Sequence, residues 1–174
     1  QGDSLTLDPH AQNEGPTTMV SRQVYEALIT RGLDMSLGPQ LATEWKIENP
    51  TTWTFNLRND VIFHDGSKMT SEDVVFSFNR ALSKTSDFKE YIDSIASVKA
   101  LDDYTVQIVT KEPNPILLNQ ISNIFIMSKA WCEKHNSVNP QDYNVSEETY
   151  AVSNTNGTGP FKITLREQNT RTVF

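Results

Sequence analysis

A strand pattern followed closely by a capped-helix pattern, within residues 52–82, is the feature that most constrains the fold of this chain. In TWTFNL, apolar Trp53, Phe55 and Leu57 alternate with polar residues, which predicts a strand with one buried face. Thr70 begins the sequence TSED ahead of apolar residues at helical spacing, so its hydroxyl is expected to cap a helix there. Two adjacent elements with different periods predict a mixture of sheet and helix.

The remaining patterns predict further hairpins and short helices. Residues 61–63 are expected to pair with the strand at 52–57 and to end at a turn over His64, Asp65 and Gly66. The other expected elements are helices at about 17–30, 116–121 and 128–135, and strands at 95–100, 105–110, 124–127, 161–165 and 170–174. Strict alternation of strand and helix is missing over residues 47–160. This favours an α+β fold over a doubly wound one.

Composition narrows the functional classes. The chain has 15 Lys and Arg against 22 Asp and Glu, which gives a net charge of −7. Binding to nucleic acid needs clustered cations, so this composition argues against a nucleic-acid-binding protein. Cys132 is the only cysteine, so neither an internal disulfide nor a cysteine zinc cage can form. No apolar stretch approaches the roughly 18 residues of a membrane span. The first residues, QGDSLTLDPH, do not read as a secretion signal.

Several segments, in order along the chain, resemble the family 5 extracellular solute-binding proteins, which include the dipeptide-, oligopeptide- and nickel-binding proteins of bacterial ABC importers. The central run contains W-T-F-x-L-R, F-H-D-G and T-x-E-D-V in register and is very specific. The matching segments are SLTLDPH (4–10), VYEALITR (24–31), PQLATEW (39–45), the run 53–82, VKALDDYTVQIVTKEPNP (98–115) and GTGPFKI (157–163).

The resemblance covers only the N-terminal third of such proteins. It implies the mixed-sheet first lobe of a periplasmic-binding-protein type II (cluster C) fold, with hairpins and short helices. Residues 1–46 and 161–174 would then be parts of the ligand-binding lobe I, and 47–160 a family-specific α+β subdomain. The second lobe and the secretion signal are expected to be absent from this chain.

The function implied by the resemblance is capture of di- or oligopeptides and their delivery to a membrane permease. Nickel, a metal chelate or another small solute such as a sugar or opine stays open as an alternative cargo. A hydrolase is a remote alternative, because neither G-x-S-x-G nor H-E-x-x-H occurs. We expect no cofactor and no catalytic residue, a monomer, and a periplasmic or extracellular location with membrane association only through the transporter.

In relatives the segment after D-P-H lines the ligand cleft, which implies that Asn13, Glu14 and Gly15 contact the ligand backbone here; the alternative is a surface turn before a helix. Phe88 falls where an aromatic residue of the oligopeptide-binding relatives covers the ligand, and a core phenylalanine is the alternative. A turn is favoured over a metal role for His64. The three histidines share no ligand spacing, so no metal site is expected.

Overall fold

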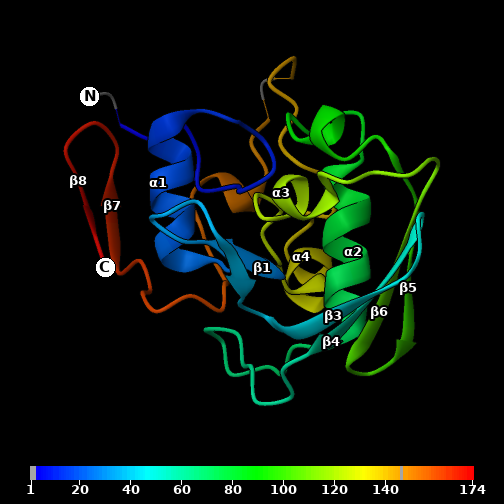
Figure 1. Cartoon of the computed structure of the whole chain (residues 1–174). Coiled ribbons are helices and arrows are strands. Elements are labelled where there is room, and N and C mark those ends of the chain that lie inside the picture. The colour runs from blue at the N-terminus through cyan, green and yellow to red at the C-terminus, as the bar shows by residue number, and fades with distance from the viewer. Residues whose placement is uncertain (1–2, 146) are drawn as a thin grey trace.

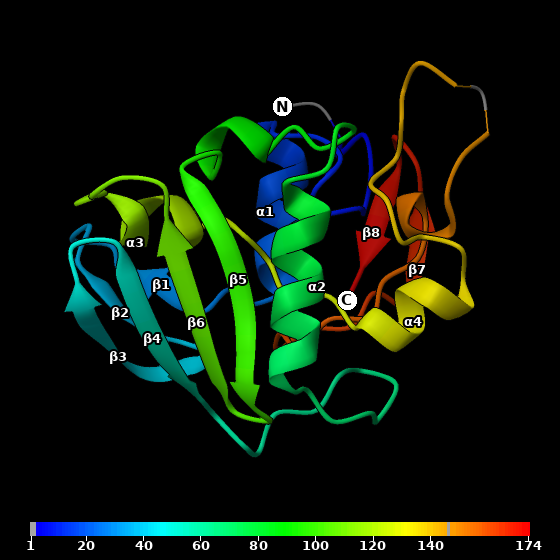
Figure 2. The ribbon, with the colours of Figure 1, turned by 90° about the vertical axis from the view of Figure 1, so that its right-hand side faces the viewer.

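A four-stranded antiparallel sheet with a helix along its inner face is the largest sheet of the computed structural model, which describes residues 3–145 and 147–174. The strand order is β3-β4-β6-β5. The sheet and its covering helix are β3 (Ala42–Asn49), β4 (Thr52–Leu57), β5 (Ile95–Asp102), β6 (Thr105–Thr110) and α2 (Ser71–Ala81). Figure 2 shows α2 lying beside β5 and β6.

The inner face of the sheet carries the alternating residues predicted from the sequence. Trp53, Phe55 and Leu57 of β4 are buried, at 5%, 0% and 6% exposure, and meet Val74 and Phe78 of α2 in one apolar core. Thr70 is the N-cap of α2, as predicted, and the bond that holds the cap runs from its backbone: the Thr70 N–H donates to the Asp73 carboxylate at 2.9 Å, as in a capping box. The strand and helix predictions for this unit are therefore confirmed.

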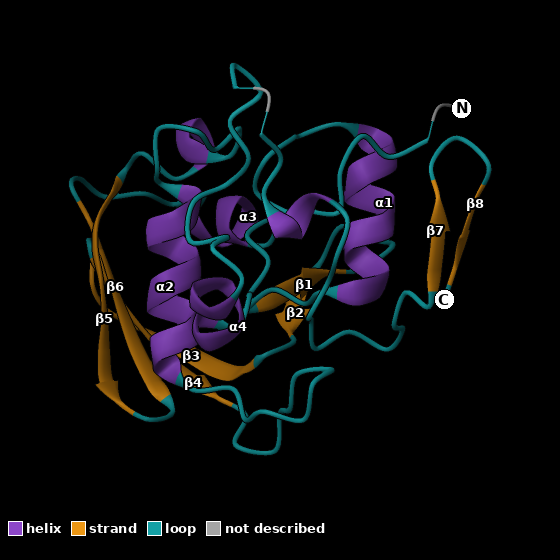
Figure 3. Ribbon diagram, turned by 180° about the vertical axis from the view of Figure 1, so that it is seen from behind, coloured by secondary structure: helices purple, strands orange, loops and turns teal. Residues whose placement is uncertain are grey.

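The other elements surround this unit. In Figure 1 the β7–β8 hairpin lies on the far side of α1 from the sheet, and Figure 3 shows from behind that loops and the short helices α3 and α4 lie between α1 and α2. These elements are α1 (Gly15–Val24), β1 (Ile29–Arg31), β2 (Leu37–Pro39), α3 (Leu117–Ile121), α4 (Lys129–Lys134), β7 (Leu165–Glu167) and β8 (Arg171–Val173), with 3-10 turns at Lys89–Tyr91 and Tyr150–Val152. The predicted hairpin of β5 and β6 and the short helices α3 and α4 are confirmed.

The pairing predicted for residues 61–63 is wrong. Both edges of β4 are occupied, by β3 on one side and β6 on the other. Residues 61–63 form an irregular excursion with one isolated bridge, between Ile62 and Lys68. The turn that follows is confirmed, since Gly66 has a φ of 90°, which favours glycine. The true partner β3 was not predicted as a strand, because most of its side chains are exposed and do not alternate.

The first helix is shorter than the predicted 17–30. It ends at Val24, and Tyr25 is extended at φ −118° and ψ 158°. The crossing segment near residue 160 takes the carbonyls at the helix end: Gly159 N–H donates to Val24 O at 2.8 Å and Phe161 N–H to Gln23 O at 3.1 Å. The helix therefore stops where tertiary hydrogen bonds replace its own.

Two further predicted strands are only partly strands. Residues 124–127 are buried as expected, yet they pair only through a bridge of Phe125 with Ala27. The strand predicted at 161–165 begins only at Leu165, because the preceding residues run along the end of α1. The last predicted strand is confirmed as β8.

The two predicted parts of the chain share one core. Leu28, Leu41 and Ala42 belong to the same buried cluster as Phe55 and Phe78. The division at residue 47 stays a prediction. None of the helices within residues 3–145 and 147–174 has the length and apolar character needed to cross a bilayer.

Candidate functional site

The predicted ligand-contacting residues Asn13, Glu14 and Gly15 lie together where the chain enters α1; we call these three residues the lip. Glu14 is the N-cap, and its Oε1 accepts the N–H of Thr17 at 3.0 Å and of Leu5 at 3.3 Å. A Cβ built on Gly15 would have no atom within 4 Å. Open space therefore lies directly against the backbone of the lip.

The lip backbone leaves two polar groups unpaired. Within the described part of the chain, the Asn13 C=O and the Gly15 N–H have no hydrogen-bond partner. Glu14 between them is extended, at φ −124° and ψ 155°. In an extended chain, the C=O of one residue and the N–H of the second residue after it point to the same side. The lip therefore presents one acceptor and one donor, spaced as in a strand edge.

A second segment, residues 86–91, holds the lip in place. The Asn13 side-chain NH₂ donates to the Tyr91 hydroxyl at 2.7 Å, and the Asn13 N–H donates to Asp87 Oδ2 at 3.3 Å. The His10 carbonyl, just before the lip, accepts the Asp87 N–H at 3.2 Å and the Ser86 hydroxyl at 3.1 Å. Both ends of the approach to the lip are thus tied to the same segment.

Phe88 lies under this segment rather than on it. It is 3% exposed, and its ring packs edge-on to His10 and tilted against Tyr91, with centroids 6.3 and 6.0 Å away. Ligand contact by Phe88 stays a prediction. Tyr91, which the sequence reasoning missed, is 41% exposed and bonded to the lip. The signal for Tyr91 in the sequence was its position as an aromatic residue three places after Phe88. In the structure it ends a 3-10 turn.

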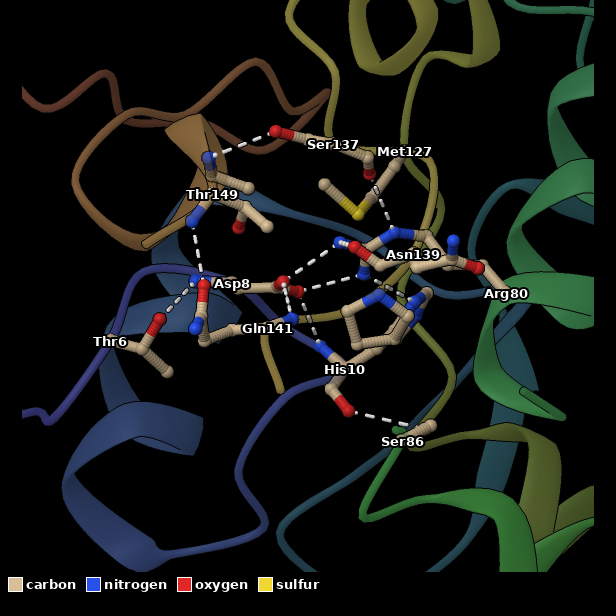
Figure 4. A network of polar contacts seen from close by, with 12 residues as sticks. Thr6, Asp8, His10, Arg80, Ser86, Met127, Ser137, Asn139, Gln141 and Thr149 are labelled. Carbon is tan, nitrogen blue, oxygen red and sulfur yellow. Dashed lines mark hydrogen bonds and ion pairs between the residues drawn. The ribbon is translucent and has the colours of Figure 1, made fainter. Parts of the chain in front are cut away.

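A buried ion pair lies behind the lip (Figure 4). Arg80 of α2 donates from Nη1 to Asp8 Oδ1 and from Nη2 to Asp8 Oδ2, each at 2.7 Å, and both side chains are 0% exposed. The Arg80 Nε donates to Ser137 O and its Nη2 to Asn139 O, both at 3.2 Å. A bidentate pair with further acceptors is the arrangement that offsets the cost of burying two charges.

His10 completes this network as a neutral ring. Its Nε2 lies 2.9 Å from the Phe125 carbonyl, which can only accept, so Nε2 carries the hydrogen and Nδ1 accepts from Arg80 Nη1 at 3.2 Å. Burial, together with the charge of Arg80, lowers the pKa of His10 to about 3. His10 is therefore a structural acceptor at neutral pH and not a proton carrier.

Each member of the Asp8–Arg80 pair keeps its partner charged. Burial alone would raise the pKa of Asp8, but the charge and hydrogen bonds of Arg80 outweigh it and the pKa of Asp8 is lowered. Burial acts to lower the pKa of Arg80, and Asp8 reverses that effect. Both groups are consequently ionised at neutral pH.

The network also fixes the described parts of the long loop, residues 136–145 and 147–149. Gln141 N–H donates to Asp8 Oδ2 at 3.2 Å, and the Gln141 side chain accepts the Thr149 N–H at 2.6 Å and donates to Glu147 O at 3.0 Å. The sequence reasoning found neither Arg80 nor Gln141. An arginine within the apolar stripe of α2 was the only signal that could have indicated the pair.

The F-H-D-G turn has a structural setting. His64 Nε2 lies 2.8 Å from Gly159 O, and Asp65 exchanges hydrogen bonds with Asn156 at 3.0 and 2.9 Å. A Cβ on Gly157 would lie 1.9 Å from Val24 O, so glycine is required where this crossing segment passes α1. Among the residues that the structure describes, no three His, Cys, Asp or Glu side chains gather as a metal site would require.

The chemistry of the site is that of recognition. Burial raises the pKa of the Cys132 thiol to about 12 and the pKa of the Tyr25 hydroxyl well above its usual range, so neither is an activated nucleophile at neutral pH. The lip offers backbone groups and the Asn13 amide, and the neighbouring Tyr91 offers a phenol; all of these groups bind by hydrogen bonding.

The known proteins that resemble this chain in sequence are solute-binding proteins. The family model described as bacterial extracellular solute-binding proteins, family 5 middle, matches residues 36–174. The periplasmic oligopeptide-binding protein OppA of Escherichia coli K12 is 32% identical over 129 residues, which cover 63% of this chain and 24% of OppA. The chain thus spans about a quarter of the length of this curated relative.

Solved structures show the same fold. DppA from Helicobacter pylori, in complex with the peptide STSA, superposes with a TM-score of 0.79 at 25% identity, over 98% of this chain and 36% of that one. NikZ from Campylobacter jejuni, in complex with Ni(L-His), superposes with a TM-score of 0.82 at 26% identity, over 96% of this chain and 32% of that one.

Proposed function

Since this chain belongs to the family 5 bacterial extracellular solute-binding proteins, we propose that it forms one wall of the ligand cleft in the substrate-binding component of an ABC importer. The family consists of non-enzymatic binding proteins, and the α+β fold predicted from the sequence is the fold of its solved members. We propose in addition that the whole protein binds a small solute, delivers it to a membrane permease and is located outside the cytoplasmic membrane.

The proposed cargo is a peptide. The observation that carries the proposal is the pair of unpaired backbone groups on the lip, the Asn13 C=O and the Gly15 N–H, flanking an extended Glu14. One residue of an extended peptide can donate its N–H to the first group and accept from the second with its C=O, as in an added strand. Because only backbone groups are read, such pairing tolerates many peptide sequences.

The buried network contributes by keeping the lip in one conformation. Asp8 and His10 precede the lip by a few residues, and both are fixed by Arg80 from α2. A lip that is already ordered does not lose conformational freedom when the ligand binds, which favours affinity. A second lobe would close over the peptide by a hinge motion, and an ABC permease would receive it.

The alternative cargo is nickel, a metal chelate or another small solute. It is favoured by one observation, the likeness to NikZ, whose solved structure holds Ni(L-His). The described residues contain no cluster of His, Cys, Asp and Glu that could hold a bare metal ion, so a chelate would have to be held by the hydrogen-bonding groups of the cleft.

Titration of the ¹⁵N-labelled chain with acetyl-trialanine amide, and separately with Ni(L-His), tests the proposal. We expect the peptide to shift the amide resonances of Asn13 and Gly15, with affinity in the millimolar range because one wall of a cleft supplies only part of the contacts. Shifts of the lip with Ni(L-His) and none with peptide would transfer the proposal to the alternative cargo.

A matched pair of variants separates lip contact from general damage. Gly15→Val places a side chain against the ligand backbone, and Gly38→Val adds the same side chain in β2; neither position has an atom within 4 Å of its built Cβ. Loss of peptide shifts in Gly15→Val alone supports the lip. Equal peptide binding by both variants would refute it.

A further inference from the structure

A pocket of about 620 Å³ lies between residues 83–85, which follow α2, and the loop that begins at Asn136. A second pocket, of about 450 Å³, adjoins it, because Asn136 and Thr149 line both. Each volume falls in the range of small-ligand sites. We call the two pockets together the outer groove, and none of the described residues that line it belongs to the lip. Its lining includes Ser83, Asn136, Val138, Asn139, Thr149 and Tyr150.

The outer groove has hydrogen-bonding groups that the protein itself does not use. Within the described part of the chain, the side-chain amides of Asn136 and Asn139 have no hydrogen-bond partner. The hydroxyls of Ser83 and Thr149 are buried and also lack a partner there, and a change of χ1 rotamer can point either of them into the groove. A buried hydroxyl without a partner costs free energy, which a bond to a ligand would recover.

The wall between the groove and the buried network is already ordered. Gln141 N–H donates to Asp8 Oδ2 at 3.2 Å, and Gln141 Oε1 accepts the Thr149 N–H at 2.6 Å (Figure 4). The two sides of the loop are therefore held together across the groove. A ligand that binds here does not have to order the backbone that carries these groups, which favours affinity.

The charged residues of the groove favour a ligand without net charge. Lys84 lines it together with two residues of opposite sign, Asp142 and Glu147. The Asp142 carboxylate already accepts the N–H and the side-chain NH₂ of Asn144, at 2.9 and 2.8 Å. The carboxylate oxygens of Glu147 can accept from neighbouring hydroxyls of a ligand. An ion of either sign would meet a charge of its own sign in the groove.

One end of the groove is an aromatic platform. Tyr150 is 44% exposed, and its ring stacks on His135 with centroids 4.2 Å apart and planes 9° from parallel. Trp131 supports the stack, with its centroid 5.6 Å from that of Tyr150. The face of an aromatic ring is negative and attracts the weakly positive C–H bonds of a sugar ring.

We propose that the outer groove is a second binding site, for an uncharged sugar of at least two rings. A hydroxyl both donates and accepts, so one ring can satisfy the amide of Asn139 and the hydroxyl of Thr149 together. The next ring then lies on Tyr150. This site goes beyond the proposed function, because it is outside the lip and does not depend on which solute the lip binds.

Titration of the ¹⁵N-labelled chain with cellobiose tests the site, with glucose and sorbitol for comparison. Cellobiose has two rings, glucose has one, and sorbitol has hydroxyls but no ring. We expect cellobiose to shift the amide resonances of Asn136, Asn139 and Tyr150 and to leave those of the lip unchanged. Glucose and sorbitol should bind at least about fivefold more weakly, since each loses contacts equivalent to one hydrogen bond or more.

Two threonine variants separate contact with the sugar from general damage. Thr149→Val removes a hydroxyl that lines the groove, and Thr158→Val removes another buried hydroxyl without a described partner, which lines neither pocket. The backbone bond of Thr149 to Gln141 is retained. Both variants should therefore keep or raise the urea midpoint of unfolding. Affinity for cellobiose should fall about fivefold in Thr149→Val and in Tyr150→Leu, and stay unchanged in Thr158→Val.

Three results would overturn the sugar site and leave the proposed function standing. They are equal cellobiose binding by Thr149→Val and Thr158→Val, equal affinity for cellobiose and sorbitol, and absence of cellobiose shifts at Asn136, Asn139 and Tyr150. Failure of the peptide titration at the lip would overturn the proposed function and leave the outer groove unaffected.

Discussion

Replacing Arg80 with methionine removes the cation behind the lip and keeps an apolar side chain in its place. The Asp8 carboxylate, 0% exposed, would lose two hydrogen bonds of 2.7 Å and keep those from His10 N–H at 3.1 Å and Gln141 N–H at 3.2 Å. Breaking a buried pair on one side costs roughly 3–5 kcal/mol. Domains are stable by about 5–15 kcal/mol, so this loss is a large part of the total.

Urea unfolding at pH 7, followed by tryptophan fluorescence, measures this loss. With a slope of about 2 kcal/mol per molar urea, the midpoint for Arg80→Met should fall by about 2 M. The matched control is Lys129→Met, which breaks the exposed pair with Glu72 at 3.2 Å and should cost less than about 1 kcal/mol. The double variant Asp8→Asn with Arg80→Met should recover part of the loss, because no unpaired charge is left buried.

The reasoning would be refuted if Arg80→Met lost no more stability than Lys129→Met. Retention of lip shifts on peptide titration by Arg80→Met, under conditions where it is folded, would refute the further claim that the ion pair keeps the lip ordered.

Three further predictions concern other buried positions. The pKa of His10 falls from 6.5 to about 3 on folding, so the unfolded state binds more protons than the folded state between those pH values. The free energy of unfolding therefore has its full value above about pH 6.5 and falls by up to about 1.4 kcal/mol per pH unit below it. His10→Gln should flatten this dependence of the unfolding free energy on pH between 4 and 7, and an unchanged slope contradicts the prediction. Cys132, buried and with a pKa of about 12, should react with a disulfide reagent at pH 8 only at the rate of unfolding, which immediate labelling would disprove. In Gly157→Ala the new Cβ would lie 1.9 Å from Val24 O, so this variant should lose at least about 2 kcal/mol of unfolding free energy in the same urea assay. The control Gly15→Ala has no atom within 4 Å of its Cβ and should change the unfolding free energy by no more than about 0.5 kcal/mol. Equal losses in the two variants would show that the close approach at Gly157 is relieved without cost.

Local patterns in the sequence determined the elements whose burial alternates along the chain. The strand β4, the hairpin of β5 and β6, and α2 with its cap at Thr70 follow from periods of two and 3.6 residues, because each of these elements has one buried face. The ordered motifs from residue 4 to 163 indicated the family as well. The strand β3 escaped the same reasoning, because seven of its eight residues are not buried and its pairing depends on β4 alone.

Tertiary structure alone decided where charges and boundaries lie. Asp8 and Arg80 are 72 positions apart, and no local period could show that they meet. The end of α1 depends on hydrogen bonds from residues beyond 156, and the buried Asp8 depends on a loop that folds back to bring Gln141 to it. Periodicity reports whether a side chain faces the core, but contacts between distant segments depend on how those faces stack, and that information is spread over the whole chain.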